Sequence, residues 1–194
     1  MPGRPKEFDR GDALQGAIEV FWSRGYEASS VAMLLDSMKI NRQSAYDTFG
    51  DKRELFMHAL NEYAGKVAGE FGQLLSEGKS PLGRVRKFLE AIRQRATGKG
   101  VHNGCLLCNT LVEVGPHDRE VRELISAIFK KLEDRLAELL KEAVKAGEIS
   151  KKRDPRQLAR FVLMVMQGAL VLSKANLDAA VNDAIAVAEG ALTA

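Results

Sequence analysis

The chain has 194 residues, of which 45% are hydrophobic and 28% are charged, and its formal net charge is +3. This is the composition of a globular protein, and the length allows one large domain or two small ones. The longest uncharged run, residues 161–173, is shorter than the roughly 18 residues that span a bilayer, so no membrane helix is expected. Because no apolar stretch follows Arg4 and Lys6, we expect a cytoplasmic location rather than secretion.

The first predicted helix precedes Gly25, a residue type that adopts positive φ at little cost just after a helix end. Its apolar residues recur three and four positions apart and define one buried stripe. They are Ala13, Leu14, Ala17, Ile18, Phe21 and Trp22.

Two short helices are predicted next. Ser29 or Ser30 can cap the second helix, whose apolar positions are Val31, Leu34, Leu35 and Met38. Asn41 can cap the third, residues 42–49, which turns Ala45 and Phe49 inward. Its outward side chains can hydrogen-bond bases or phosphates, namely Arg42, Gln43, Ser44, Tyr46 and Asp47. Helices packed this closely have the geometry of a helix-turn-helix.

Gly50 ends the third helix, and a fourth begins directly after it. Asp51 and Glu54 form an acidic variant of the capping box at its start. Its apolar positions are Leu55, Phe56, Ala59, Leu60 and Tyr63.

These motifs resemble the DNA-binding domain of the tetracycline-repressor (TetR) family. The resembling segments are Gly25-Tyr26 and residues 29–31, 44–49 and 52–55. The resemblance covers about a quarter of the chain, at its N-terminal end. Tyr46, Phe49, Lys52 and Leu55 have the family's Tyr-x-x-Phe-x-x-Lys-x-x-Leu spacing. Lys39 departs from the family, which usually has glycine in this turn, and positive φ at a lysine costs roughly 1 kcal/mol. The resemblance implies a DNA-binding domain over residues 1–60 and a ligand-sensing and dimerisation domain over residues 61–194.

DNA contacts are predicted from the placement of charge rather than its total, because residues 1–60 hold eight Lys and Arg against nine Asp and Glu. The cations expected to supply positive charge are Arg4 and Lys6 on the N-terminal arm, Arg42 on the third helix, and Lys52 and Arg53 at the start of the fourth. Arg42 and Gln43 are candidate base readers, since arginine pairs with guanine and glutamine with adenine, and Ser44 is a weaker candidate. Four side chains are candidate phosphate contacts, Tyr46, Lys52, Ser29 and Ser30, with capping by the serines and packing of Tyr46 as the alternatives. Arg4, within Gly3-Arg4-Pro5, resembles an AT-hook core or lies on a solvated arm.

Further helical patterns fill the rest of the chain. Helices are expected over residues 82–92, 105–114, 118–144, 155–170 and 179–192, with Asp154-Pro155 as a cap and first helical residue. The helix over 105–114 is nearly all apolar, which is typical of the centre of a bundle. No segment alternates like a strand, so the fold class is all-α with about nine helices. The last two helices are rich in Ala, Gly, Val and Met; in the family such helices form a four-helix homodimer interface, and the alternative is that they are core.

Both cysteines lie in the segment 103–110, three residues apart. Gly104-Cys105-Leu106, with Asn109 and Glu113, resembles the central helix of a TetR subgroup in which some members sense electrophiles or oxidants. A thiol at a helix start has a lowered pKa, so Cys105 is the candidate sensor, and inert packing is the alternative for Cys105 and Cys108. His102 is the only nearby further ligand, so no metal is expected, nor any cofactor.

A small-molecule pocket is predicted from the helix faces, with both apolar and polar members. Buried polar groups need partners, which can be neighbours, water or a ligand, and this applies to Asn109, Thr110, Glu113 and Gln167. The apolar and thiol members are Phe88, Ile92, Cys105, Phe129 and Met166.

Together these observations predict a homodimeric, one-component transcriptional regulator that binds a palindromic double-stranded operator. A small-molecule inducer or a thiol-reactive species would release it. Two other classes of protein are possible. An enzyme that uses Cys105 and His102 is not expected, because no third catalytic group appears. The other alternative is a helical interaction module that does not bind DNA.

Overall fold

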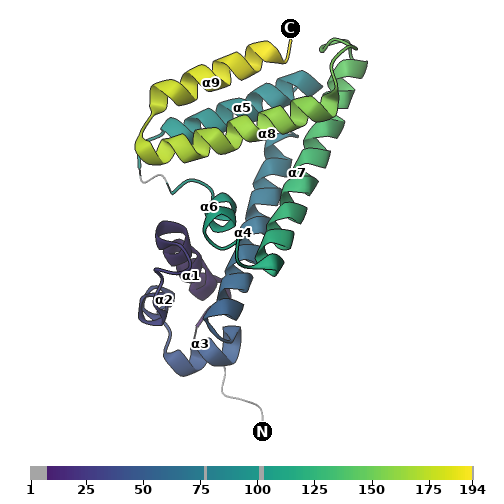
Figure 1. The fold of residues 1–194 in the computed structure, drawn as a ribbon. Helices are drawn as coiled ribbons and strands as arrows, with labels where there is room; N and C mark the ends of the chain where they lie inside the picture. The colour runs from purple at the N-terminus through teal and green to yellow at the C-terminus, as the bar shows by residue number, and fades with distance from the viewer. Residues whose placement is uncertain (1–7, 77, 101–102, 194) are drawn as a thin grey trace. The chain divides into compact units, whose positions relative to one another are not determined.

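The computed structural model describes residues 8–76, 78–100 and 103–193. Within these residues the chain forms nine α-helices, one short 3₁₀ helix and no strand (Figure 1). In chain order the elements are α1 (Arg10–Arg24), α2 (Val31–Met38), α3 (Arg42–Phe49), α4 (Lys52–Leu74), α5 (Pro81–Thr97), α6 (Leu106–Glu113), α7 (Arg119–Lys145), α8 (Pro155–Leu172), η1 (Ser173–Ala175) and α9 (Asp178–Ala191). The predicted all-α fold is confirmed.

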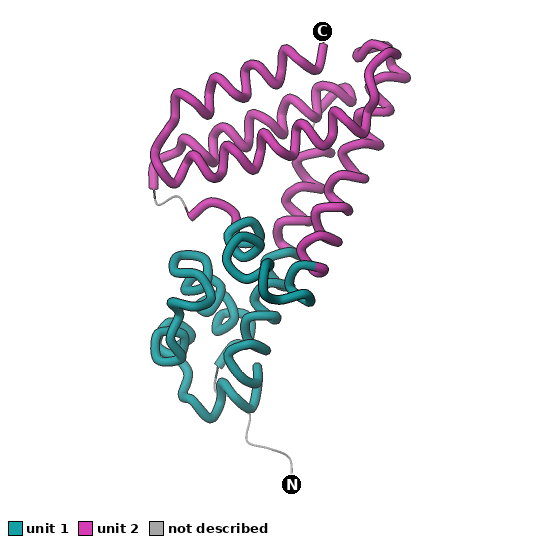
Figure 2. Tube along the Cα trace, viewed as in Figure 1, with its two compact units in different colours: residues 1–65, 106–122 teal, residues 66–105, 123–194 magenta. Residues whose placement is uncertain are grey.

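The chain divides into two compact units (Figure 2). The first unit contains the residues up to Gly65 together with Leu106–Arg122, and the second contains Lys66–Cys105 and Glu123–Ala194. The family resemblance implied two domains that meet at residue 60. The first unit also takes in α6 and the start of α7, which the predicted division assigned to the second domain.

A glycine brings α1 and α2 together in the first unit. A Cβ at Gly16 would lie 2.5 Å from the carbonyl oxygen of Ser37 at the end of α2. The Ser37 hydroxyl donates a hydrogen bond to the Gly16 carbonyl at 3.0 Å. The largest buried side chains of this unit are Ile18, Phe21, Leu34, Phe49, Phe56, Leu60, Leu106 and Leu107.

Local side-chain caps set the starts of the first three helices. Asp9, Ser30 and Asn41 each accept a hydrogen bond from the backbone N–H three residues later, at 2.9, 3.2 and 2.8 Å. The capping box of α4 is also present, because Asp51 and Glu54 accept each other's backbone N–H at 2.9 and 2.8 Å. Each cap satisfies helix donors that would otherwise lack a partner.

The turn between α2 and α3 is held by a left-handed residue. Lys39 has φ 55° and ψ 37°, the conformation that the family's usual glycine adopts without strain. The lysine therefore carries the strain that the sequence comparison with the family's glycine pointed out for this turn.

In the second unit α5, α8 and α9 pack against one another. The Phe71 ring on α4 meets the Phe88 ring on α5 edge-on, with centroids 5.0 Å apart. Arg135 on α7 donates to the carbonyl of Gly72 on α4 at 3.4 Å. The second unit is thus a helical bundle with its own aromatic core.

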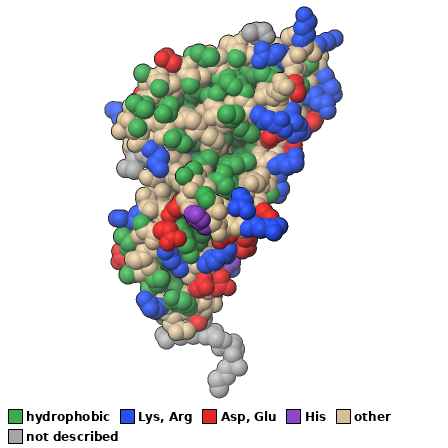
Figure 3. Space-filling view, in the orientation of Figure 1, with side chains coloured by type: hydrophobic (Ala, Val, Ile, Leu, Met, Phe, Trp, Pro, Cys, Tyr) green, Lys and Arg blue, Asp and Glu red, His purple; other side chains and the backbone are tan. Residues whose placement is uncertain are grey.

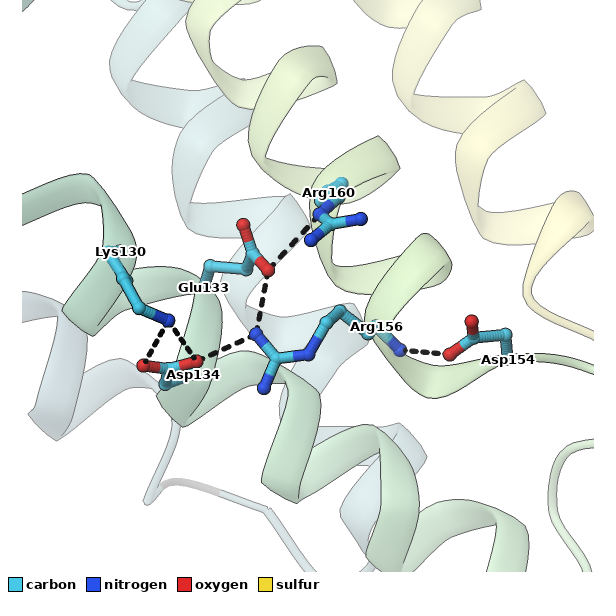
Figure 4. A network of polar contacts seen from close by, with 6 residues as sticks. All are labelled: Lys130, Glu133, Asp134, Asp154, Arg156 and Arg160. Atoms are coloured by element: carbon cyan, nitrogen blue, oxygen red, sulfur yellow. Dashed lines mark hydrogen bonds and ion pairs between the residues drawn. The ribbon is translucent and has the colours of Figure 1, made fainter. Parts of the chain in front are cut away.

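An ion-pair network joins α7 to the start of α8 (Figure 4). Arg156 donates to Glu133 at 2.8 Å and to Asp134 at 2.7 Å, Arg160 donates to Glu133 at 3.1 Å, and Lys130 lies 3.3 Å from Asp134. Hydrogen bonds from Arg156 are the main reason why the pKa values of Glu133 and Asp134 are lowered. Both carboxylates are partly exposed to water, so the ion pairs add little to the free energy of unfolding. Their main effect is to orient the start of α8 against α7.

One helical stretch in the described residues, Pro155–Ala175, is long and apolar enough to cross a bilayer, with a mean hydropathy of 1.5. The expectation of no such helix rested on the uncharged run alone, and it missed this longer window. Of the window, 39% is buried inside the protein, and α8 contacts both α5 and α9. These contacts are those of a bundle helix with one exposed apolar side.

Candidate nucleic-acid interface and sensor segment

The outward face of α3 carries the predicted base readers. Ala45 and Phe49 are buried beneath the helix, whereas Arg42 and Gln43 are exposed. Tyr46 is 43% exposed, which is unusual for a large apolar ring. A short helix with an arginine, an amide and a tyrosine on one solvent-facing side has the chemistry that reads base edges and phosphates.

Gln43 already has a partner on the same helix. Its side-chain amide donates to the Asp47 carboxylate at 2.8 Å. Bidentate pairing with adenine requires both the amide N–H and the carbonyl oxygen, so this bond must open for Gln43 to read that base. Arg42 has no such competitor among the hydrogen bonds that the structure describes.

Lys52 stands at the first position of α4, over an aromatic ring. Its ammonium lies 4.4 Å from the centroid of the Tyr26 ring, within the range of a cation–π interaction. Tyr26 also packs on Phe56, with ring centroids 4.6 Å apart, and burial is the main reason why its pKa is raised. The ring therefore positions the lysine at the helix start, where backbone N–H groups also attract anions.

The two serines before α2 have different roles. Ser30 is exposed and caps the helix, as Met33 N–H donates to its hydroxyl. Ser29 is fully buried, and its hydroxyl donates to the carbonyl of Gly25. The predicted phosphate contact of Ser29 is inconsistent with this burial, because the side chain cannot reach a phosphate without opening the turn.

Arg53, expected with Lys52 to supply positive charge for DNA, is engaged inside the first unit. It lies 2.7 Å from Asp118 and 2.9 Å from Glu120. The hydrogen bonds that Arg53 donates to Glu120 and Asp118 raise its own pKa. The hydrogen bond from the Val121 backbone N–H is the main cause of the lowered pKa of Asp118. These two ion pairs are contacts that sequence reasoning did not find.

Glu113, predicted as a ligand or sensor group, is bound by the backbone of the helix-turn-helix. The N–H groups of Tyr26 and Glu27 donate to its two carboxylate oxygens at 3.0 and 2.9 Å. The sequence left a neighbouring group, water or a ligand as partners for Glu113, and in the structure the partner is neighbouring backbone. A ligand-binding role for this carboxylate is not supported.

Cys105 directly precedes α6 and is 7% exposed, whereas Cys108 is half-buried, and neither forms a disulfide. Gly104 before it has φ 70°, and a Cβ there would lie 3.1 Å from the carbonyl oxygen of Leu170 on α8. The thiol thus sits at a helix start, as predicted, and a reagent must displace neighbouring groups to reach it. Thr110 is buried, and Asn109 is half-buried.

The predicted pocket residues are only partly brought together. Phe88 and Ile92 on α5 and Met166 on α8 are buried on helices that pack against each other, whereas Phe129 and Gln167 are half-buried. Asn109 belongs to the first unit. A hollow of about 230 Å³ lies elsewhere in the second unit, and it is lined by Arg153, Asp154, Gln157, Leu158, Phe161 and Ala191.

Large apolar side chains are exposed on α8 and α9. Met164 is 74% exposed, Val187 68% and Val171 54%. Gly168 and Gly190, on the same two helices, have open space where a Cβ would be. Figure 3 shows hydrophobic side chains gathered over these helices on the face in view.

Two sequence predictions fall outside the described residues: the DNA-contacting Arg4 and the nearby His102. Within the described part of the chain, no group of three or more His, Cys, Asp and Glu side chains is placed to hold a metal ion.

A capped helix-turn-helix with an exposed recognition helix, followed in the chain by a helical bundle, defines a DNA-binding protein of the helix-turn-helix class. The family description "Bacterial regulatory proteins, tetR family" matches residues 13–59, and "Tetracyclin repressor-like, C-terminal domain" matches residues 81–188, more than half of the chain. The chain belongs to the TetR family of transcriptional regulators.

Individual relatives agree with this assignment. The chain is 34% identical to the HTH-type transcriptional regulator YezE of Bacillus subtilis, over 91% of each chain. It is 30% identical to the HTH-type transcriptional repressor ComR of Escherichia coli, over 89% of this chain and 82% of ComR. Among solved structures, a cysteine mutant of the TetR family regulator CifR, complexed with 26-bp operator DNA, is 32% identical with a TM-score of 0.83, covering 97% of this chain and 98% of that chain.

Proposed function

We propose that the protein is a homodimeric repressor that binds a palindromic operator through α3 and is released by a small molecule or by modification of Cys105. The observation that carries the DNA-binding part is the solvent-facing row Arg42, Gln43 and Tyr46 on a capped recognition helix. Similarity to a regulator solved on its operator supports it. As for other regulators of this kind, the site of action is the cytoplasm.

In this proposal Arg42 and Gln43 read base edges, with Ser44 beside them, while Tyr46, Lys52 and Ser30 contact phosphates. Arg4 would add a minor-groove or phosphate contact from the N-terminal arm. Two recognition helices must lie roughly 34 to 36 Å apart, or a multiple of that distance, to enter successive major grooves. The operator is therefore expected to be palindromic.

The experiment is operator binding by the purified chain and by Arg42→Ala, measured by fluorescence anisotropy on fragments of its own promoter region. Loss of a bidentate base contact weakens binding by about 1–3 kcal/mol and relaxes specificity at one position. Arg86→Ala is the matched control, because Arg86 is exposed on α5 in the second unit. Equal affinity of Arg42→Ala and Arg86→Ala would exclude Arg42 as a base reader.

The dimer is proposed to form through the exposed apolar side of α8 and α9. Exposed Met164, Val171 and Val187, with small residues between them, make a surface that a second copy can cover closely. Met164→Arg should shift the protein to monomers in light scattering, whereas Val112→Arg, at an 80% exposed apolar position of α6, should not. A Met164→Arg dimer as tight as wild type would contradict this interface.

Release is proposed to start from the second unit. An inducer would lie among Phe88, Ile92, Met166, Phe129 and Gln167 on α5, α7 and α8. The inducer would bind a form of the dimer that does not fit the operator a few kcal/mol more tightly than the form that does. Operator affinity would then fall by tens- to thousands-fold.

Cys105 is the proposed site of release by thiol reagents, because it directly precedes α6 and helix starts are positions where reactive cysteines recur. After treatment with an alkylating agent, wild type should leave the operator, while Cys105→Ser should stay bound and Cys108→Ser should behave like wild type. Equal release of wild type and Cys105→Ser would place the sensor elsewhere.

A further inference from the structure

The last residue of α6 is joined to the loop that connects α1 with α2. Both oxygens of the Glu113 carboxylate are used: Oε2 accepts from Tyr26 N–H at 3.0 Å, and Oε1 accepts from Glu27 N–H at 2.9 Å. Two consecutive backbone donors on one carboxylate fix position and orientation together, which a single hydrogen bond cannot do. This α6 contact lies 87 and 86 residues along the chain from the loop that it holds.

Gly25 makes room for the carboxylate. A Cβ at Gly25 would lie 2.6 Å from Glu113 Oε2 and 2.9 Å from Glu113 Cδ. Gly25 also has φ 83°, which a side chain would disfavour. The glycine of the Gly-Tyr motif thus serves the carboxylate contact as well as the helix end.

The loop that Glu113 holds is tied to the helices that present α3. The Tyr26 ring lies against Phe56 of α4 and under the Lys52 ammonium. The carbonyl of Gly25 accepts a hydrogen bond from the hydroxyl of Ser29, and Ser29 directly precedes Ser30, the cap of α2. A shift of the Glu113 carboxylate therefore moves the loop, and through it the starts of α2 and α4.

The chain just after Glu113 contacts the same unit at a second place. Asp118 caps α7 by accepting Val121 N–H at 3.1 Å, and with Glu120 it binds Arg53 at the start of α4. The segment 113–120 thus contacts both the α1–α2 loop and α4. Two separated contacts constrain rotation of the helix-turn-helix more than either contact alone.

We propose that Glu113 is a positioning residue for operator binding: its carboxylate holds the α1–α2 loop so that the recognition helix is presented in one orientation. This inference rests on the proposed function, because positioning is measured through the operator. Glu113 itself does not touch DNA in this scheme. It acts by reducing the orientational freedom that operator binding must otherwise remove.

The test compares wild type, Glu113→Gln and Glu113→Ala, with Glu142→Gln as control. Glutamine has one acceptor oxygen where two N–H donors converge, and alanine has none. Glu142 is exposed on α7, so its replacement makes the same change in net charge without touching the loop. Operator affinity is measured by fluorescence anisotropy well below the unfolding temperature, and amide hydrogen exchange is measured at Tyr26 and Glu27.

We expect operator binding roughly 5- to 30-fold weaker for Glu113→Gln, because a hydrogen bond to a charged group is equivalent to roughly 10- to 100-fold in an equilibrium constant and relaxation recovers part of it. The Tyr26 and Glu27 amides should exchange about tenfold faster. Glu113→Ala should be weaker still, and Glu142→Gln should match wild type. If Glu113→Ala does not fold, Glu113→Gln alone decides.

A lower unfolding temperature with unchanged operator affinity would show a structural role only and would overturn the proposal. Unchanged exchange at the two amides would overturn it as well, because the hydrogen bonds would then not restrain the loop. Failure of wild type to bind any promoter fragment would instead count against the proposed function. The two failures are therefore distinguishable.

Discussion

The contact between α1 and α2 gives a sharp test of how closely the helix-turn-helix is packed. In Gly16→Ala the added Cβ would lie 2.5 Å from the Ser37 carbonyl oxygen, 2.8 Å from its carbon and 3.1 Å from Met38 N. All three atoms are backbone, so no flexible side chain can move aside. The helices must separate, and the Ser37 to Gly16 hydrogen bond at 3.0 Å must lengthen.

The magnitude follows from two opposing effects. Overpacking of this kind costs about 1–3 kcal/mol, and a strained hydrogen bond adds about 1 kcal/mol. Alanine in place of glycine inside a helix gains about 0.5–1 kcal/mol. The steric cost is larger, so Gly16→Ala should destabilise the protein by about 1–3.5 kcal/mol.

The matched control is Gly65→Ala on α4, where a Cβ would meet nothing within 4 Å. That variant should be stabilised by about 0.5–1 kcal/mol, because only helix propensity changes. Urea unfolding at one fixed protein concentration, followed by circular dichroism and Trp22 fluorescence, measures both. If Gly16→Ala were stabilised as much as Gly65→Ala, the close approach of α1 and α2 would be refuted.

Two further predictions concern the Lys39 turn and the Asp118 contacts. Lys39→Gly should stabilise the protein by about 0.5 kcal/mol in urea unfolding, because it removes a left-handed penalty of roughly 1 kcal/mol while glycine's larger unfolded-state entropy offsets part of the gain. A loss of stability would show that the lysine side chain makes contacts that outweigh the strain. The pKa of Asp118 is lowered in the folded protein, so its ionised form contributes stability above the unfolded pKa of about 3.9, and this contribution is lost as the pH falls through the folded value. Asp118→Asn should therefore show a shallower loss of unfolding temperature between about pH 5 and pH 2, and a curve parallel to wild type would contradict the assignment.

The sequence predicted the features that depend on neighbouring residues. The caps at Ser30, Asn41 and Asp154 and the capping box of Asp51 with Glu54 are all present, because each joins groups only two or three positions apart. Helix order follows from the same local rules. At Ser29 and Ser30 the pattern allowed either cap, and burial decided between them.

Long-range pairing was not predictable in the same way. Glu113 was recognised as a polar residue that needs a partner, but the partner is backbone far along the chain, and backbone donors leave no mark in the sequence. Arg53 looked like a DNA-binding cation because it follows Lys52, whereas its carboxylate partners lie 65 and 67 residues away. Spacing rules extend over one or two helical turns, and these contacts depend on how whole helices pack.

The number of Lys and Arg residues near the recognition helix is therefore larger than the number whose charge is available to DNA. Near α3, Arg53 is paired with Asp118 and Glu120 and Lys52 is held over Tyr26. Arg42 on α3 and Lys39 in the turn before it are exposed. A surface with few free cations attracts DNA weakly without regard to sequence, because non-specific affinity scales with the phosphates that are neutralised. Discrimination between sites then depends on the orientation in which α3 meets the base edges. The contacts of Glu113 and Arg53 are suited to this demand, since both fix the helix-turn-helix without adding positive charge at the DNA surface.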